Sequence, residues 1–526
     1  MTPDDGPARR RVRPTGHRGR RRRVPACVPA LLLFGAPLAP EVAAPQRVDA
    51  DRISDGTGLP VEEVVLANGM RFLLLERTGA PTVSFVVHVG VGSIHDPPGQ
   101  TGVSHFLEHL LFKGTTTIGT TDVALERIHM DAMDAVHDSI VQEGVMPSAG
   151  PGVVERLQAR LEALEDSARA YVIPNEYDQI LTSHGARGPN ATTGYEATTY
   201  YVSLPSNRAK LWFVLESDRM RSPVLREFHT ERRVIMEERR LRTETSAPAL
   251  LSATYYGAAF TDHPYGVPPI GYAEDLLRLS RREVEAHHQR YYGPGQTTIA
   301  IVGRFEADSA AVWAERYFGT IERRGAAPPA PPPEGVQVEP RRVETRYDAG
   351  PAIRIGWKVP SGLAPESPAL QVLANLLVGS TDARLHRRLV IDDRIAASVF
   401  AGTGPGRLHP GLFTIQAIPI APHAPEDVEA AIYSELDRLR RVPPTDGELR
   451  RVRRALLAAE VRRLASAEGL AFQLASSQAA WGDWRETFRL QERMRAVGRD
   501  EIARVLDVYF RPEGRTVAIL RPAEEP

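Results

Sequence analysis

The sequence predicts an α+β fold of two homologous domains that arose by internal duplication. A repeated segment and a proline-rich linker support this prediction. Residues 283–302 match residues 501–520 at an offset of 218 (502 − 284 = 218), and each copy has the pattern of a helix, a turn and a strand. The linker, residues 325–340, divides the chain into two parts of similar size.

Residues 1–46 have the pattern of a secretory signal, or leader. Nine arginines between residues 9 and 23 precede a short apolar run, residues 24–39, and then the small residues Ala43 and Ala44. The run is too short to span a bilayer comfortably, so we expect a secreted or periplasmic protein, or a membrane-anchored one if the leader stays uncleaved. A start codon assigned too early is the alternative.

The composition restricts the chemistry. Lys+Arg number 65 and Asp+Glu 66, so the overall charge gives no indication of nucleic-acid binding. The only cysteine, Cys27, lies in the leader. The mature chain is therefore expected to have neither a disulfide nor a cysteine-based zinc site, and any metal ion must be bound by His, Asp or Glu.

The mature chain is expected to begin with strands. Residues 62–76 have the pattern of a β-hairpin with Asn68-Gly69 at its turn. Residues 82–90 predict a strongly apolar strand, in which we expect His88 to be a packed side chain rather than a ligand. A loop containing glycine and proline then leads to a helix.

That helix lies within residues 104–116 (S-H-F-L-E-H-L-L-F-K-G-T-T) and carries the central motif. His105, Glu108 and His109 stand at positions i, i+3 and i+4, which share one helix face. Two such imidazoles can bind one metal ion, and the carboxylate beside them can take a proton from water. Apolar residues cover the rest of the helix, which predicts burial, and buried polar groups are costly unless paired or metal-bound. A structural helix with two satisfied histidines is the simpler alternative.

Residues 121–187 are predicted to be a helical insertion packed on the surface of the first domain. Two polar, amphipathic helices are expected within it, at residues 122–140 and 153–171. Four histidines at helical positions, inside and outside the insertion, are expected to be solvated: His129, His137, His287 and His288.

Further elements of the first domain follow the insertion. Residues 188–205, rich in Thr and Tyr, predict a strand or hairpin. Residues 226–244 predict a helix in which Glu231 and Glu238 are seven residues apart. Seven residues are close to two turns, so these two carboxylates share a face, whereas Glu237 points elsewhere.

The second copy repeats the scaffold of the motif without its polar groups. At an offset of 266 (373 − 107 = 266), F-L-E-H-L-L-F-K-G aligns with V-L-A-N-L-L-V-G, and the motif residues face Gln371, Ala374 and Asn375. At the offset of 218, the two glutamates face Leu449 and Leu456. We therefore predict an active domain at residues 60–324 and a silent homologous domain at residues 341–524.

Four stretches in this order resemble the insulinase/pitrilysin family of inverzincin zinc peptidases, which includes the mitochondrial processing peptidases. They are H-F-L-E-H-L-L-F-K-G-T, N-A-T-T-G-Y-E-A-T-T-Y-Y, E-R-R-V-I-M-E-E and H-P-Y-G. The resemblance covers roughly residues 60–522. It implies two homologous α+β domains, each a mainly antiparallel sheet with helices packed on it. Such pairs of domains face each other across a closed chamber, which admits peptides or unfolded segments rather than folded proteins.

The resemblance also implies roles for individual residues. One zinc ion (Zn2+) per chain would be held by His105, His109 and Glu238, with Glu108 as the catalytic general base. Glu231 would orient a zinc-bound histidine. Asn190 and Ala191 resemble the family's edge strand, which binds an extended peptide substrate by β-augmentation.

The chain departs from the family pattern in two respects. The gap from His109 to Glu238 is 129 residues (238 − 109 = 129), longer than usual because of the insertion. Family members often use an Arg and a Tyr from the second half to bind substrate, but Val390 and Ala397 occupy those positions here. We therefore expect a homologous partner subunit, or a second copy in a homodimer, to supply that pair.

The sequence therefore favours a zinc metalloendopeptidase that acts on peptides outside the cytoplasm. A non-catalytic peptide-binding or assembly subunit of the same fold is the alternative, but all the expected metal-binding and base residues are present. A zinc enzyme that acts on something other than peptides has no sequence feature in its favour.

Overall fold

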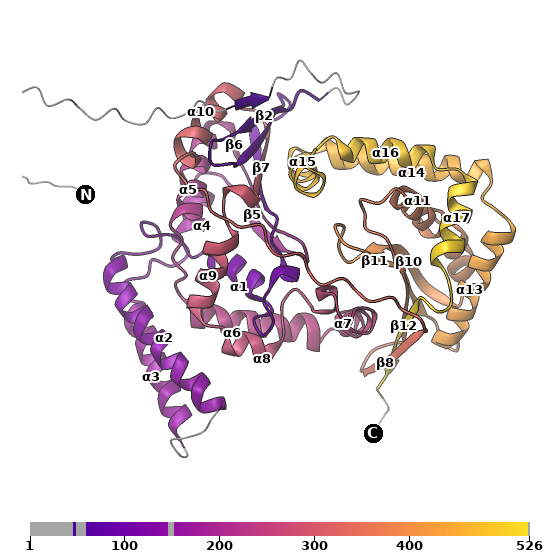
Figure 1. Cartoon of the computed structure of the whole chain (residues 1–526), viewed down its shortest axis with the longest axis horizontal. Coiled ribbons are helices and arrows are strands. Elements are labelled where there is room, and N and C mark those ends of the chain that lie inside the picture. Colours follow the sequence, from indigo (N-terminus) through magenta and orange to yellow (C-terminus); the bar gives the residue numbers. More distant parts are fainter. Residues whose placement is uncertain (1–45, 49–58, 146–151, 524–526) are drawn as a thin grey trace, which may run out of the picture. The chain divides into compact units, whose positions relative to one another are not determined.

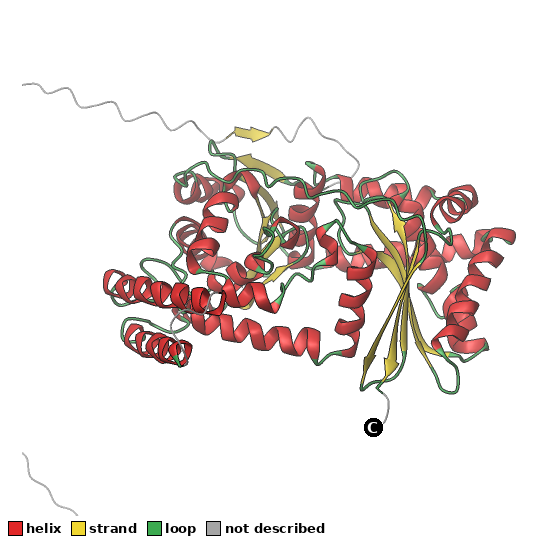
Figure 2. Ribbon diagram, turned by 60° about the horizontal axis from the view of Figure 1, so that its bottom comes forward, coloured by secondary structure: helices red, strands yellow, loops and turns green. Residues whose placement is uncertain are grey.

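The computed structural model describes residues 46–48, 59–145 and 152–523 (Figure 1). The predicted leader lies outside these residues, apart from Gln46. None of the helices in the described part of the chain is both long and apolar enough to cross a membrane. Helices and two β-sheets make up the described residues (Figure 2).

The first sheet has the strand order β1-β2-β3-β7-β4-β6-β5. Its strands are β1 (Gln46–Val48), β2 (Glu62–Val65), β3 (Arg71–Glu76), β4 (Thr82–Val89), β5 (Arg187–Thr193), β6 (Thr198–Pro205) and β7 (Thr297–Gly303). Only β3 and β7 pair in parallel. The predicted hairpins are confirmed, and Gly69 at the first turn has a positive φ of 94°.

The second sheet repeats this connectivity in the order β10-β11-β9-β12-β8. Its strands are β8 (Arg341–Tyr347), β9 (Ala352–Val359), β10 (Ala396–Gly404), β11 (Gly411–Pro419) and β12 (Arg515–Pro522). Strands β8 and β12 are parallel and the other pairs antiparallel, as in the chain β3-β7-β4-β6-β5. The predicted fold class, with its internal duplication, is therefore confirmed.

Alternation along the strands creates two apolar faces on the first sheet. On β3, Phe72 and Leu74 point to one face, whereas Leu73 and Leu75 point to the other. The first face is covered by α1 (Val103–Leu110), α5 (Ala209–Arg221), α9 (Arg281–Tyr291) and α10 (Ala307–Phe318). The second face is covered by α15 (Ala467–Trp481), which belongs to the second half of the chain.

The second sheet also has one face covered by helices of its own half and one face covered by a helix of the other half. One face packs on α11 (Ser367–Val378), α13 (Pro425–Arg441) and α17 (Arg499–Tyr509). The other face packs on α7 (Ala247–Ala259) from the first half, where the Tyr255 hydroxyl lies 2.8 Å from Thr414 Oγ1. Each half therefore contributes one helix to the sheet of the other. The division predicted at residues 325–340 stays a prediction; residues 326–338 there form neither helix nor strand.

The insertion forms a helical hairpin, α2 (Val123–Val145) and α3 (Val153–Ala168), followed by α4 (Glu176–Ser183) (Figure 1). The remaining helices are α6 (Phe228–Arg239), α8 (Ala273–Arg278), α12 (Arg384–His386), α14 (Asp446–Ala465) and α16 (Glu486–Ala496). A π-helical turn, Arg240–Glu244, extends α6.

The expectation that the helical histidines are solvated is wrong for three of the four. His137 is buried, and its Nε2 lies 3.2 Å from the Leu277 carbonyl oxygen. His287 and His288 are buried because α9 packs against α1 and the first sheet. His129 is half-buried and stacks on Tyr171. Neighbours from distant segments cover these residues.

A buried ion pair fixes the insertion to the loop after α1. The Arg226 and Glu126 side chains are each 1% exposed, and Arg226 Nε donates to Glu126 Oε1 at 2.9 Å. The guanidinium also donates to three backbone carbonyls, those of Lys113, Thr115 and Ile118. Each of its three nitrogens therefore donates to a partner inside the protein.

We expect Arg226→Met to lower the free energy of unfolding by about 3–5 kcal/mol, because Glu126 would remain buried without its cation. Thermal and urea unfolding would measure the loss. Arg169→Ala is the matched control, because it removes an exposed pair with Asp166 and should cost at most about 1 kcal/mol. Equal losses in the two variants would contradict the structural role assigned to Arg226.

Candidate metal centre

The carboxylate of Asp96 caps the N-terminus of helix α1. Asp96 accepts hydrogen bonds from the backbone N–H of Gly102 at 2.8 Å, from that of Ser104 at 3.2 Å, and from the Ser104 hydroxyl at 2.6 Å. Gly102 has a φ of 87°, and a Cβ there would lie 2.5 Å from the Ile270 carbonyl oxygen. Only glycine fits at this start of the helix. Because the helix begins at Val103, His105 lies on its first turn.

The motif helix is buried, as predicted. Phe106, Leu107 and Leu110 are fully buried, and His105 and Glu108 are only 6% and 8% exposed. The two imidazole rings, of His105 and His109, have centroids 4.8 Å apart.

Helix α6 brings the remaining donor to α1. The rings of Phe106 and Phe228 stack at a centroid distance of 4.6 Å. Glu238 then lies with one oxygen 3.7 Å from His105 Nε2 and the other 3.3 Å from His109 Nε2. Donors bound to zinc at about 2.0–2.2 Å lie about 3.3–3.6 Å apart in a tetrahedron. One ligand atom from each of these three side chains lies within 4.8 Å of the others, so their spacing is close to that of a zinc donor set.

Glu231 lies behind His109. Its Oε2 is 3.3 Å from His109 Nδ1, and its Oε1 is 2.6 Å from Lys113 Nζ. Lys113 also pairs with Glu227 at 3.2 Å. Glu237 points away and pairs with Arg240 on the surface, which confirms the faces predicted for the helix. Glu231 is thus placed to hold the His109 ring with its Nε2 toward Glu238.

The charge states of the centre follow from burial and from these pairs. Burial lowers the pKa of His105 to about 4. Burial also disfavours a charge on His109, but Glu231 and Glu238 outweigh it and raise the pKa of His109 to about 9. The His109 hydrogen bond lowers the pKa of Glu238. The carboxylates of Glu231 and Glu238 therefore stabilise a positive charge at His109, and a metal cation can take the place of the proton that carries it.

Glu108 completes the cluster on its open side. Burial raises its pKa, against the effect of a 2.5 Å hydrogen bond that the Thr193 hydroxyl donates to Glu108 Oε2. A raised carboxylate pKa suits a group that accepts a proton and later returns it.

Sequence reasoning missed three polar neighbours. Lys113 follows His109 by four residues, and Arg242 follows Glu238 by four, so helical spacing could have identified both. Arg242 Nη1 lies 2.7 Å from Glu238 Oε1, although its side chain is 70% exposed. Thr193 stands in a threonine-rich strand, where Thr is common for reasons of strand propensity, and nothing distinguished it.

The predicted substrate-binding residues lie on β5, the edge strand of the first sheet beside α1. Asn190 is exposed, and its Oδ1 accepts the backbone N–H of Ala191 at 2.9 Å. In the second half, Val390 packs against the apolar core and Ala397 is exposed on β10. Neither side chain offers a hydrogen-bond donor.

Two family models match the chain. The model described as Insulinase (Peptidase family M16) matches residues 71–133, and that described as Peptidase M16 inactive domain matches residues 278–456. The zinc protease PqqE of Helicobacter pylori is 24% identical over 349 residues, 65% of this chain and 66% of that protein. An uncharacterized zinc protease of Mycobacterium bovis is 26% identical over 362 residues, 68% of this chain and 69% of that protein. The chain thus spans about two thirds of the length of these relatives.

The fold also resembles solved structures. The crystal structure of a protease from Helicobacter pylori superposes with a TM-score of 0.73 at 22% identity, covering 88% of this chain and 99% of that one. At this identity the likeness establishes the fold.

We expect Asp96→Asn to change how stability depends on pH. Burial raises the pKa of Asp96 to about 7, so between about pH 4 and 7 the folded chain holds a proton that the unfolded chain has released. Stability due to this group therefore falls as pH rises across that window, by at most about 4 kcal/mol. The difference between the melting temperatures at pH 4.5 and pH 7.5 should be smaller in the variant than in the wild type. The same difference in both proteins would contradict this assignment.

Proposed function

The chain belongs to the insulinase family of peptidases (M16), and on this premise we propose that it is a zinc-dependent endopeptidase. The observation that carries the proposal is the convergence of His105, His109 and Glu238 beside Glu108, with no residue of the second half required for the donor set. Three donors leave one coordination position open, as a catalytic zinc requires.

The residues divide the chemistry between them. His105, His109 and Glu238 would hold the zinc ion, which would supply Lewis acidity toward a peptide carbonyl and lower the pKa of water. Glu108 takes the proton of the attacking water and returns it to the leaving amine. Thr193 orients the Glu108 carboxylate through its hydrogen bond. Glu231 keeps His109 in the ligating orientation, and Lys113 balances the charge of Glu231.

The proposed substrate is an extended peptide or an unfolded protein segment. Strand β5 is an open sheet edge that contacts α1 and ends at Thr193, so a peptide added to it as a strand would pass Glu108. Its backbone would replace the Asn190 side chain as the partner of the Ala191 N–H.

A partner and a location complete the proposal. We infer that a homologous subunit, or a second copy of this chain, supplies the Arg and Tyr that Val390 and Ala397 do not, because donors near a developing oxyanion are worth a few kcal/mol. The basic, then apolar, pattern of residues 1–46 supports export from the cytoplasm, to the periplasm or the exterior.

A second candidate is a non-catalytic peptide-binding or assembly subunit of the same fold. The match of residues 278–456 to an inactive peptidase domain favours it for the second half. The intact cluster in the first half favours catalysis.

Glu108→Gln should abolish cleavage of an unstructured peptide mixture by the zinc-loaded chain, at least about 10²-fold below the wild type, because the general base is lost. Cleavage would be followed by mass spectrometry. Glu237→Gln is the matched control on the exposed side of α6 and should leave the rate unchanged. Zinc binding without cleavage in the wild type would favour the non-catalytic subunit, or a missing partner.

Glu231→Gln should weaken zinc binding about 10–100-fold, because the carboxylate that orients His109 and offsets the cation is lost. Competition with a chromogenic chelator would measure the dissociation constant, which requires no turnover. The same substitution at Glu237 again provides the control. Equal affinities in the two variants would remove Glu231 from the site.

A further inference from the structure

A cavity of about 650 Å³ lies between the first sheet and the second half of the chain. It is lined from the β5–β6 turn, from the loop at residues 405–409 between β10 and β11, from α11, and from α15 and α16. Hydroxyl and amide groups line it together with leucine, proline and alanine side chains. This mixture suits a peptide chain, which carries both polar backbone and apolar side chains.

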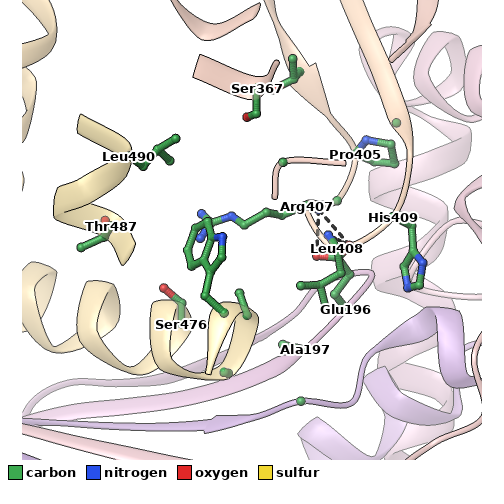
Figure 3. A pocket seen from close by; sticks show the side chains of 18 of the residues that line it. Glu196, Ala197, Ser367, Pro405, Arg407, Leu408, His409, Ser476, Thr487 and Leu490 are labelled. Carbon is green, nitrogen blue, oxygen red and sulfur yellow. Dashed lines mark hydrogen bonds between the residues drawn. The ribbon is translucent and has the colours of Figure 1, made fainter. Parts of the chain in front are cut away.

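Arg407 projects into this cavity. Figure 3 shows its side chain extending from the loop toward Ser476 and Thr487. The guanidinium carbon lies 4.9 Å from the centroid of the Trp481 ring. Within the described residues, no hydrogen bond or ion pair of this guanidinium is found; it stacks on Trp481, and the charge of Glu196 attracts it from further away. An arginine held on an aromatic face keeps its fork of donors available for an anion.

The loop that carries Arg407 is held in place by the first domain. Both oxygens of Glu196, in the β5–β6 turn, accept the backbone N–H of Arg407, at 2.8 and 2.9 Å. Glu196 Oε1 also accepts the Leu408 N–H at 2.7 Å and the Tyr265 hydroxyl. The Arg407 side chain is therefore presented from a fixed backbone.

The two arginines that line the cavity differ in how their charges are balanced, because Arg463 has a carboxylate partner and Arg407 has none in direct contact within the part of the chain that the structure describes. Among the described residues that line it, Glu196 is the only acidic one, and its oxygens are already taken up by these donors. Arg463 lines the same cavity and pairs with Glu460. Burial lowers the pKa of Arg463, and the nearby charge of Arg407 lowers it further, so the two guanidinium groups repel each other across the cavity. A bound anion would relieve that repulsion.

One short segment of chain contributes a residue to the candidate metal centre and a residue to the cavity. Thr193, which bonds Glu108, and Glu196, which lines the cavity, are the two ends of one short turn. Three residues of chain span at most about 10 Å. A peptide that reaches Glu108 along β5 can therefore extend into the cavity.

We propose that this cavity is a subsite for a carboxylate of the peptide substrate, with Arg407 as its principal contact. The carboxylate comes from the C-terminus of the peptide or from an acidic side chain several residues from the cleaved bond. The proposal rests on the proposed function, which it deepens by naming a substrate class: peptides with negative charge on one side of the cleavage site.

Peptide binding tests the proposal without turnover. Fluorescein-labelled, unstructured peptides of about twelve residues would be titrated by anisotropy against the full chain carrying Glu108→Gln. In the first matched pair, one peptide ends in a free C-terminal carboxylate and the other in a C-terminal amide. In the second pair, both peptides end in an amide, and one has Glu where the other has Gln, at positions two to eight residues from the middle of the peptide. We expect about tenfold tighter binding of the carboxylate member of one pair, since a charge-assisted hydrogen bond is lost in the other member. The pair that responds identifies the source of the carboxylate.

Arg407→Gln should abolish that preference, and Arg407→Lys should retain part of it, because the charge remains while the fork is lost. Arg504→Gln, on the exposed face of α17, is the matched control and should keep the full tenfold ratio. Unchanged melting temperatures would show that the variants fold. A preference that persists in Arg407→Gln, or no preference in the starting chain, would overturn the proposal.

The two proposals fail separately. If the zinc-loaded wild type cleaves peptides but the two members of each peptide pair bind with equal affinity, the peptidase proposal stands and the carboxylate subsite falls. If the affinity ratio is tenfold and depends on Arg407 but no peptide is cleaved, the carboxylate subsite stands and endopeptidase activity of the chain on its own falls.

Discussion

The site depends on the packing of α6 against α1. The stacked pair Phe106 and Phe228, together with fully buried Ile235, holds the two helices close enough for carboxylates on one to meet imidazoles on the other. The polar groups are buried or partly buried at this contact, where each would be costly alone. They are stable together because Lys113 and His109 supply positive charge and Glu231 and Glu238 supply negative charge. Removing any one of them leaves a buried charge without its partner.

Much of the fold and of the candidate site could be predicted because the informative patterns are local. Helical spacing placed His105 with His109, and Glu231 with Glu238, on common faces, and the repeated segment revealed the two sheets. The contacts that sequence could not reveal are made by segments far apart. The burial of His137 depends on packing near Leu277, and the partner of Glu108 is a threonine in a strand where threonine is unremarkable. The exchange of α7 and α15 leaves no local pattern either, since a helix packs equally well on either sheet.

The β5–β6 hairpin joins three tasks in one short segment. Its first strand is the open edge, its Thr193 orients the Glu108 carboxylate, and its Glu196 holds the loop of the second half. A movement of that loop would therefore reach the base through a few residues of chain. The two halves differ in the polar groups they carry, but this hairpin gives the second half a direct mechanical connection to the half that holds the candidate metal centre.

The reciprocal exchange of helices has a consequence for biosynthesis. The first sheet is finished when β7 has been made, yet among the described residues its second face is covered mainly by α15 and by Trp484, whose indole donates to Glu63 across 421 residues of sequence. Ribosomes add about 5–20 residues per second, so the 181 residues from Gly303 to Trp484 (484 − 303 = 181) take about 9–36 seconds. During that interval the α15 residues and Trp484, which pack on this apolar face, have not yet been made. The nascent chain must therefore stay unfolded or be shielded until its last helices emerge.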